Sequence, residues 1–151
     1  MKKTLDKKII LRSVMICLAA VMMIVIFAFS AQTASISNQV SDFFTNKVFA
    51  SLGLSERFIR KAAHFTEFAV LGAFIMTFLS TFSLRRVYCA AISVSLCALY
   101  AAGDEFHQTF VSGRSGQISD VVLDTCGALF GVALACLVMW IISKKKKEKQ
   151  S

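Results

Sequence analysis

Four long apolar stretches constrain this chain more than any other feature. They cover residues 9–31, 62–82, 87–103 and 121–142. A helix needs about 20 residues to cross the hydrocarbon core of a bilayer. Because 56% of the 151 residues are apolar and most of them lie in these stretches, little is left for a water-soluble core. The sequence therefore predicts an all-α integral membrane protein with four transmembrane helices.

Basic residues gather on one side of the predicted spans. Twelve of the 17 lysines and arginines precede or open the first span, lie between the second and third, or follow the fourth. Positive charge marks the cytoplasmic side of a membrane protein. We therefore expect cytoplasmic basic termini, 1–8 and 143–151, on either side of a membrane domain over 9–142. The net charge of +8 then suits membrane lipids with anionic headgroups, and no nucleic-acid partner is expected.

The first span has an alternative interpretation as a cleaved signal peptide. It begins with basic residues, and the small residues at 28–31 resemble a cleavage site. Its apolar run is longer than the 7–15 residues of a usual signal peptide, which favours an uncleaved span.

One long outer segment separates the first two spans. Its apolar residues recur at steps of three and four, which predicts an amphipathic helix over 36–52. Such a helix lies flat in the outer membrane interface, or else packs across the mouth of the bundle. Gly53 ends it, and Ser55 with Glu56 opens the next helix.

Polar and ionisable residues collect at one depth near the outer ends of the spans. Counting about 20 residues from each basic boundary brings them into one layer. Charges at bilayer depth are costly and usually functional, so we expect a ligand-binding site there. The expected site residues are Lys61, His64, Glu67, Asp104, Glu105, Gln108, Arg114, Asp120 and Asp124.

Three of these residues are also candidate catalytic bases. Glu67 lies beside His64 at a step of three on one helix, and a carboxylate next to an imidazole fixes its tautomer. Glu105 is the third candidate base, with Arg114 as a clamp for an oxyanion or a phosphate. No nucleophile is evident. Alternatively, His64 and its basic neighbours Arg60 and Lys61 are interface anchors that extend toward the headgroups.

The end of the third span raises the question of a metal. Asp104, His107 and Gln108 share a face with Tyr100, and two acids with a histidine are consistent with zinc. The spacing is not the H-E-x-x-H motif, so we assign neither a metal nor a cofactor.

A glycine-rich turn follows, with Gly113 and Gly116 on either side of Arg114. Arg114 could bind a carboxylate or phosphate through both arms of its guanidinium. It could equally neutralise Asp104 or Asp120.

The fourth span carries acids and glycines on one face. Asp120, Asp124, Gly127 and Gly131 follow one another at steps of four, three and four. Gly-x-x-x-Gly is a helix-packing motif in membranes. We therefore predict that both acids point into the bundle.

These residues resemble those of the VanZ-like membrane proteins over about residues 10–142. The shared pattern has a lysine, a histidine and an aromatic in one helix (Lys61, His64 and Phe68), where the family usually has tyrosine at the third position. An Asp-Glu pair, a glutamine and a glycine-flanked arginine follow, and then a span that opens with aspartate and glycine. The residues from Ser30 to Gln32, with Ser37 and Ser41, are also similar.

The resemblance implies a multi-pass protein of the bacterial plasma membrane. The family is named for low-level resistance to teicoplanin, a glycopeptide that binds cell-wall precursors. The leading hypothesis is a cell-envelope protein that binds a polar ligand at the outer cluster: a lipid headgroup, a cell-wall precursor or a glycopeptide. The alternatives are a membrane-embedded hydrolase or transferase, metal-dependent or not, and a scaffold whose charges set the helix register. The oligomeric state is left open.

Overall fold

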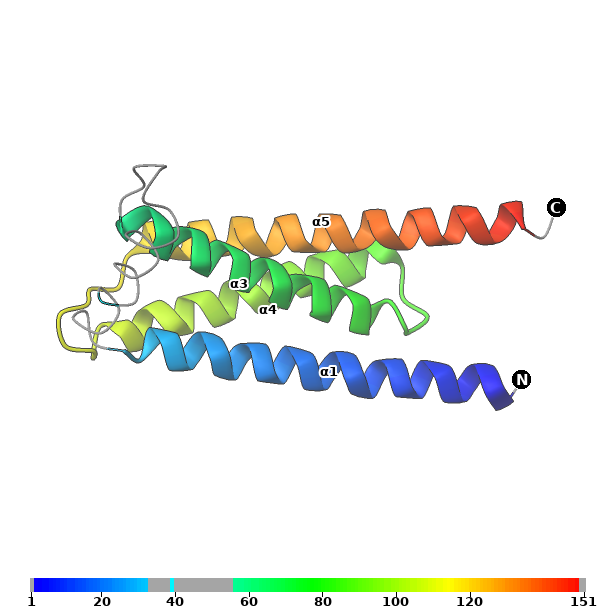
Figure 1. Ribbon diagram of the computed structural model, residues 1–151, viewed down its shortest axis with the longest axis horizontal. Coiled ribbons are helices and arrows are strands. Elements are labelled where there is room, and N and C mark those ends of the chain that lie inside the picture. Colours follow the sequence, from blue (N-terminus) through cyan, green and yellow to red (C-terminus); the bar gives the residue numbers. More distant parts are fainter. Residues whose placement is uncertain (1, 33–38, 40–55, 150–151) are drawn as a thin grey trace.

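The computed structural model describes residues 2–32, 39 and 56–149, and within these ranges the chain is helical apart from its turns (Figure 1). The four long helices are α1 (Lys2–Ser30), α3 (Glu56–Leu79), α4 (Arg86–Gln108) and α5 (Ile118–Glu148). All four are long and apolar enough to cross a membrane, and the described residues include no strand. The predicted all-α class with four spans is confirmed.

The helices extend beyond the apolar stretches that predicted them. α4 continues from the predicted end at 103 to Gln108 and so includes Asp104 and Glu105. α1 and α5 run on into the basic termini. α3 begins at Glu56, as predicted. The predicted amphipathic helix over 36–52 lies outside the described residues except for position 39.

The helices form an antiparallel bundle with two chemically different ends. Figure 1 shows both termini and the turn between α3 and α4 at one end, and the turn between α4 and α5 at the other. The basic residues of α1, α4 and α5 therefore lie at one end. The candidate site residues lie at the opposite end.

The closest packing is between α3 and α5. A Cβ at Gly127 would collide with the carbonyl oxygen of Phe65, and one at Gly131 with that of Ala69. In return, a Cβ at Gly72 would lie 2.7 Å from the carbonyl oxygen of Ala128. Glycines on both helices let the backbones touch, so the predicted packing role of Gly127 and Gly131 is confirmed.

α1 packs against α3 and makes only a few contacts with α4. At the basic end, the Arg12 guanidinium donates to the Thr81 hydroxyl at 2.8 Å and to its carbonyl oxygen at 2.9 Å. Toward the other end, the Tyr100 hydroxyl of α4 donates to the Met23 carbonyl oxygen at 2.7 Å. Between these ties lies an apolar groove of about 450 Å³, bordered by α1, α3 and α4.

Enlarging the glycines of α5 should loosen the bundle. Gly131→Ala and Gly127→Ala should each lower the free energy of unfolding by about 1–3 kcal/mol, because the new methyl group forces the two backbones apart. Unfolding in mixed micelles at increasing sodium dodecyl sulfate measures this.

Gly103→Ala is the matched control, because a Cβ at Gly103 meets nothing within 4 Å. It should leave stability unchanged or raise it slightly, since alanine favours a helix by about 1 kcal/mol over glycine. Equal effects at positions 103 and 131 would contradict the packing argument.

Candidate functional site

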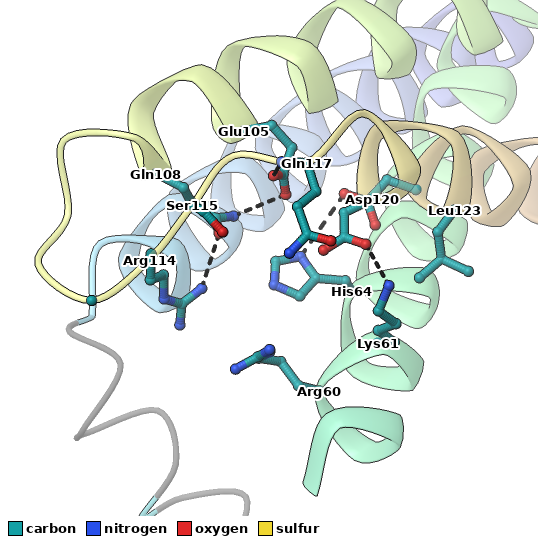
Figure 2. A pocket seen from close by; sticks show the side chains of 12 residues that line it. Arg60, Lys61, His64, Glu105, Gln108, Arg114, Ser115, Gln117, Asp120 and Leu123 are labelled. Atoms are coloured by element: carbon teal, nitrogen blue, oxygen red, sulfur yellow. Dashed lines mark hydrogen bonds and ion pairs between the residues drawn. The ribbon is translucent and has the colours of Figure 1, made fainter.

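A small polar cavity opens at the acidic end of the bundle, between α3, α4, α5 and the turn over 109–117 (Figure 2). Its volume is about 90 Å³. Seven of the nine predicted site residues line it. They are Lys61, His64, Glu105, Gln108, Arg114, Asp120 and Asp124.

The innermost polar contact joins α3 to α5. The Asp124 side chain is fully buried, at 0% exposed, and its Oδ2 lies 3.9 Å from Nδ1 of His64. Among the described residues, neither Asp124 oxygen has a hydrogen-bond partner, and neither does His64 Nδ1. A buried carboxylate without hydrogen bonds is costly. The pair therefore has unused hydrogen-bonding capacity at the cavity wall.

One turn closer to the mouth, the same two helices form a complete ion pair. Lys61 Nζ donates to Asp120 Oδ1 at 2.6 Å, and both side chains are partly exposed. The position of Lys61 follows from helix geometry. Lys61 lies three residues before His64 on one face of α3, and Asp120 lies four residues before Asp124 on the facing side of α5, so the two pairs meet one turn apart. Lys61 and Asp120 satisfy each other.

A hydrogen-bond network on α4 orders the opposite wall. Gln108 Nε2 donates to Asp104 Oδ2 at 3.1 Å and to Glu105 Oε1 at 3.2 Å. The other Glu105 oxygen, Oε2, accepts from the backbone N–H of Gln117 at 2.8 Å. Both Glu105 oxygens are thus engaged, which fits a positioning residue better than a free base.

The turn between α4 and α5 is folded back onto this wall. Gly113 has a φ of 76°, a left-handed conformation that favours glycine. Gly116 lies so close to the carbonyl oxygen of Glu105 that a Cβ would collide with it. The two predicted turn glycines thus let the loop fold and approach α4, and they place Arg114 at the mouth.

Arg114 has hydrogen bonds but, within the described ranges, no carboxylate partner. Its Nη1 donates to Gln108 Oε1 at 3.3 Å and its Nη2 to the Phe29 carbonyl oxygen at 3.5 Å, while its buried Nε has no partner among the described residues. Among the ion pairs of these residues, none joins Arg114 to Asp104 or Asp120. The alternative in which Arg114 neutralises one of these acids through a direct ion pair is therefore not observed among the described residues.

Arg60 is a cavity residue that the sequence prediction left outside the site. Its side chain lines the mouth, and Figure 2 shows its guanidinium pointing into the same opening as that of Arg114. Burial, together with the positive charge of Arg60, lowers the pKa of Arg114 from its usual value. The spacing of four between Arg60 and His64 could have identified it, because residues four apart share a helix face.

Two predicted site residues lie behind the cavity wall. Asp104 is almost fully buried and is held by Gln108, although its Oδ1 has no hydrogen-bond partner in the described part of the chain. Glu67 is half-buried and interacts electrostatically with Asp104. Neither lines the cavity, although Asp104 is hydrogen-bonded to the lining residue Gln108.

The possible zinc ligands at the end of α4 do not converge. The His107 ring packs against Phe27 of α1, with centroids 4.7 Å apart, and does not line the cavity. Within the part of the chain that the structure describes, no three His, Cys, Asp or Glu side chains are grouped to hold a metal ion. His107 instead helps to fix α1 against α4.

The Lys61–Asp120 pair should stabilise the contact between α3 and α5 at the mouth. In a double-mutant cycle of Lys61→Met and Asp120→Asn, we expect a coupling free energy of about 1 kcal/mol, because the pair is partly exposed. Unfolding in mixed micelles measures each variant. Additive effects of the two substitutions would show that the pair contributes nothing to stability.

The comparison with known proteins identifies the family of this chain. The family model VanZ/LLP1 matches residues 15–140, which include every residue of the cavity. No match was found among curated proteins or solved structures. With four membrane-spanning helices and a match over most of its length, the chain is a multi-pass membrane protein of the VanZ/LLP1 family.

Proposed function

We propose that this protein binds a polar ligand in the cavity at the acidic end of its bundle. The observation that carries the proposal is Asp124, a fully buried carboxylate with two oxygens that accept no hydrogen bond from the described residues. Truly unsatisfied buried polar groups are rare in proteins and need an explanation. A ligand that donates hydrogen bonds to Asp124 supplies one.

The incomplete pairing around the cavity supports binding over a purely structural role. A scaffold would have its charges matched, as Lys61 and Asp120 are. Arg60 and Arg114 face the same opening instead, and Asp124 has only the distant His64 among the described residues. Charges of like sign that face each other cost free energy unless a counter-charge joins them. The cavity is therefore suited to a charged ligand.

We propose that binding takes place at the outer face of the bacterial plasma membrane, with both termini in the cytoplasm. The basic residues at the end that holds the termini support this orientation. Ligands available there include lipid headgroups, cell-wall precursors and glycopeptides. Resistance to teicoplanin by this member is part of the same proposal, with capture of one of these molecules as its basis.

The orientation has a direct test. Ser115→Cys places a thiol at the cavity mouth, and a membrane-impermeant maleimide should label it in intact cells. A cysteine at Lys147, near the end of α5, should react only after the cells are opened. Cys17→Ser and Cys126→Ser, which remove the two exposed native thiols, provide the background. Labelling at 147 but not at 115 in intact cells would invert the proposed topology.

The function is tested by teicoplanin sensitivity at matched protein levels. Expression of the wild-type protein should raise the inhibitory concentration. Asp124→Asn and Arg114→Gln should return it to that of cells without the protein, because each removes one of the unmatched charges.

Arg57→Gln serves as the control, since Arg57 is an exposed cation on the same helix as His64 and does not line the cavity. If Asp124→Asn and Arg114→Gln protect as well as the wild type at equal abundance, the cavity does not carry resistance.

The contact between His64 and Asp124 favours a second candidate function, that of a membrane-embedded hydrolase or transferase. A carboxylate that faces an imidazole nitrogen orients a general base, and Arg114 is placed to bind an oxyanion or phosphate. Assays on lipid-linked and amide substrates, with and without chelator, test it. Turnover that is lost in His64→Gln would establish an enzyme, and the absence of product from every substrate would leave binding alone.

A further inference from the structure

Some charged side chains of the cavity have no partner of opposite charge in hydrogen-bond contact among the described residues, and we call these unmatched. The unmatched cations and the unmatched acid lie in different parts of the cavity. Two cations without a carboxylate partner in the described ranges, Arg60 and Arg114, lie together at the mouth. Asp124, a buried acid without a hydrogen-bond partner among the described residues, lies on the inner wall, and the acids Glu105 and Asp120 line the same cavity. The cavity therefore has a positive mouth and a negative inner wall.

His64 lies between these two regions. It interacts electrostatically with the cations Arg60 and Arg114 and also with the acids Asp104 and Asp120. Figure 2 shows its ring in the centre of the cavity, with both guanidinium groups on its outer side. His64 also contacts the inner acid, since its Nδ1 lies 3.9 Å from Oδ2 of Asp124.

From this arrangement we infer that the ligand is a small zwitterion. Its ammonium group donates hydrogen bonds to Asp124, and its phosphate or carboxylate accepts them from Arg60 and Arg114. The inference rests on the proposed binding function and specifies the chemical class of the ligand.

Each half of this assignment has its own unpartnered atoms. The buried Nε of Arg114 has no acceptor among the described residues, and a guanidinium commonly binds a phosphate or carboxylate with two parallel N–H donors. Both Asp124 oxygens lack a donor in the same ranges, and an ammonium has three N–H groups. A ligand with a single charge would satisfy one region and leave the other unmatched.

The size of the cavity limits the ligand to a small group. Its volume is about 90 Å³, whereas a water molecule has a share of about 30 Å³ in the liquid. Such a space accepts the ammonium end of a phosphoethanolamine headgroup or of an amino acid, with the anionic group of the ligand at the mouth. These two sources, a lipid and a soluble molecule, share the same chemistry.

The test uses the purified full-length protein in a non-ionic maltoside detergent and isothermal titration calorimetry. The probes are O-phosphoethanolamine, which carries both charges, inorganic phosphate, which carries only the negative one, and ethanolamine, which carries only the positive one. O-phosphoethanolamine should bind about tenfold or more tightly than either single-charge probe, because it makes charge-assisted hydrogen bonds in both regions.

The variants separate the two regions. Asp124→Asn should reduce O-phosphoethanolamine affinity about tenfold or more and leave phosphate binding unchanged. Arg114→Gln should weaken the binding of phosphate and of O-phosphoethanolamine, and it should leave ethanolamine binding unchanged. Arg57→Gln and Asp6→Asn, at exposed positions outside the cavity, are the charge-matched controls. Circular dichroism and micelle unfolding verify that each variant is folded.

Two results would overturn the inference. If phosphate binds as tightly as O-phosphoethanolamine and Asp124→Asn changes neither, the site takes an anion only, and the proposed binding function survives. If none of the three probes binds, the ligand is not a zwitterion of this class, and teicoplanin sensitivity still tests the proposed function separately.

Nanodiscs distinguish the two sources. If a lipid headgroup enters the cavity, phosphatidylethanolamine nanodiscs should weaken binding of soluble O-phosphoethanolamine relative to phosphatidylglycerol nanodiscs. Equal affinity in both would identify a soluble zwitterion as the ligand. Both results support a zwitterion site.

Discussion

The backbone contact between α3 and α5 is the constraint on which the site depends. Gly127 allows the α5 backbone to reach the carbonyl oxygen of Phe65, the residue after His64. Asp124 lies one turn before Gly127, so the same approach brings its carboxylate to His64. Larger residues at the glycines would separate the helices and with them the two halves of the cavity. In this protein the packing motif and the polar site are parts of one interface.

Electrostatics explains why the cluster lies at the end of the bundle and not at its centre. Ionised groups are costly in hydrocarbon, and those within spans usually face the interior or a water-filled cavity. The Lys61–Asp120 pair lies at the mouth, where both side chains remain partly exposed. Only Asp124 is completely buried among the cavity acids, and its oxygens have no hydrogen-bond partner among the described residues.

Most of the fold could be predicted from the sequence because each signal was local. Apolar length predicted the four helices, and the steps of four, three and four from Asp120 to Gly131 predicted the inward face of α5. The ends of α4 and α5 were less predictable, since hydrogen bonds of the helix backbone continue where hydropathy falls. Periodicity also cannot say which of several polar residues meets which across the bundle.

The site shows the same division between local and long-range information. The predicted depth of each residue in the membrane identified seven of the lining residues, because residues at one level of a bundle lie near one another. It also included Glu67 and Asp104, which face neighbouring side chains behind the wall, and it left out Arg60. The pairing of Gln117 with Glu105 carries no sequence signal, because the donor is a backbone N–H.

The first helix has a consequence of its own. Arg12 ties it to the α3–α4 turn near one end, and Tyr100 holds it at Met23, 11 residues along. These ties lie about 16 Å apart along a helix axis. They oppose sliding of α1 along the bundle, and the apolar groove between them borders α1, α3 and α4. Because side chains do not fill this groove, α1 should be displaced sideways more easily than lengthwise.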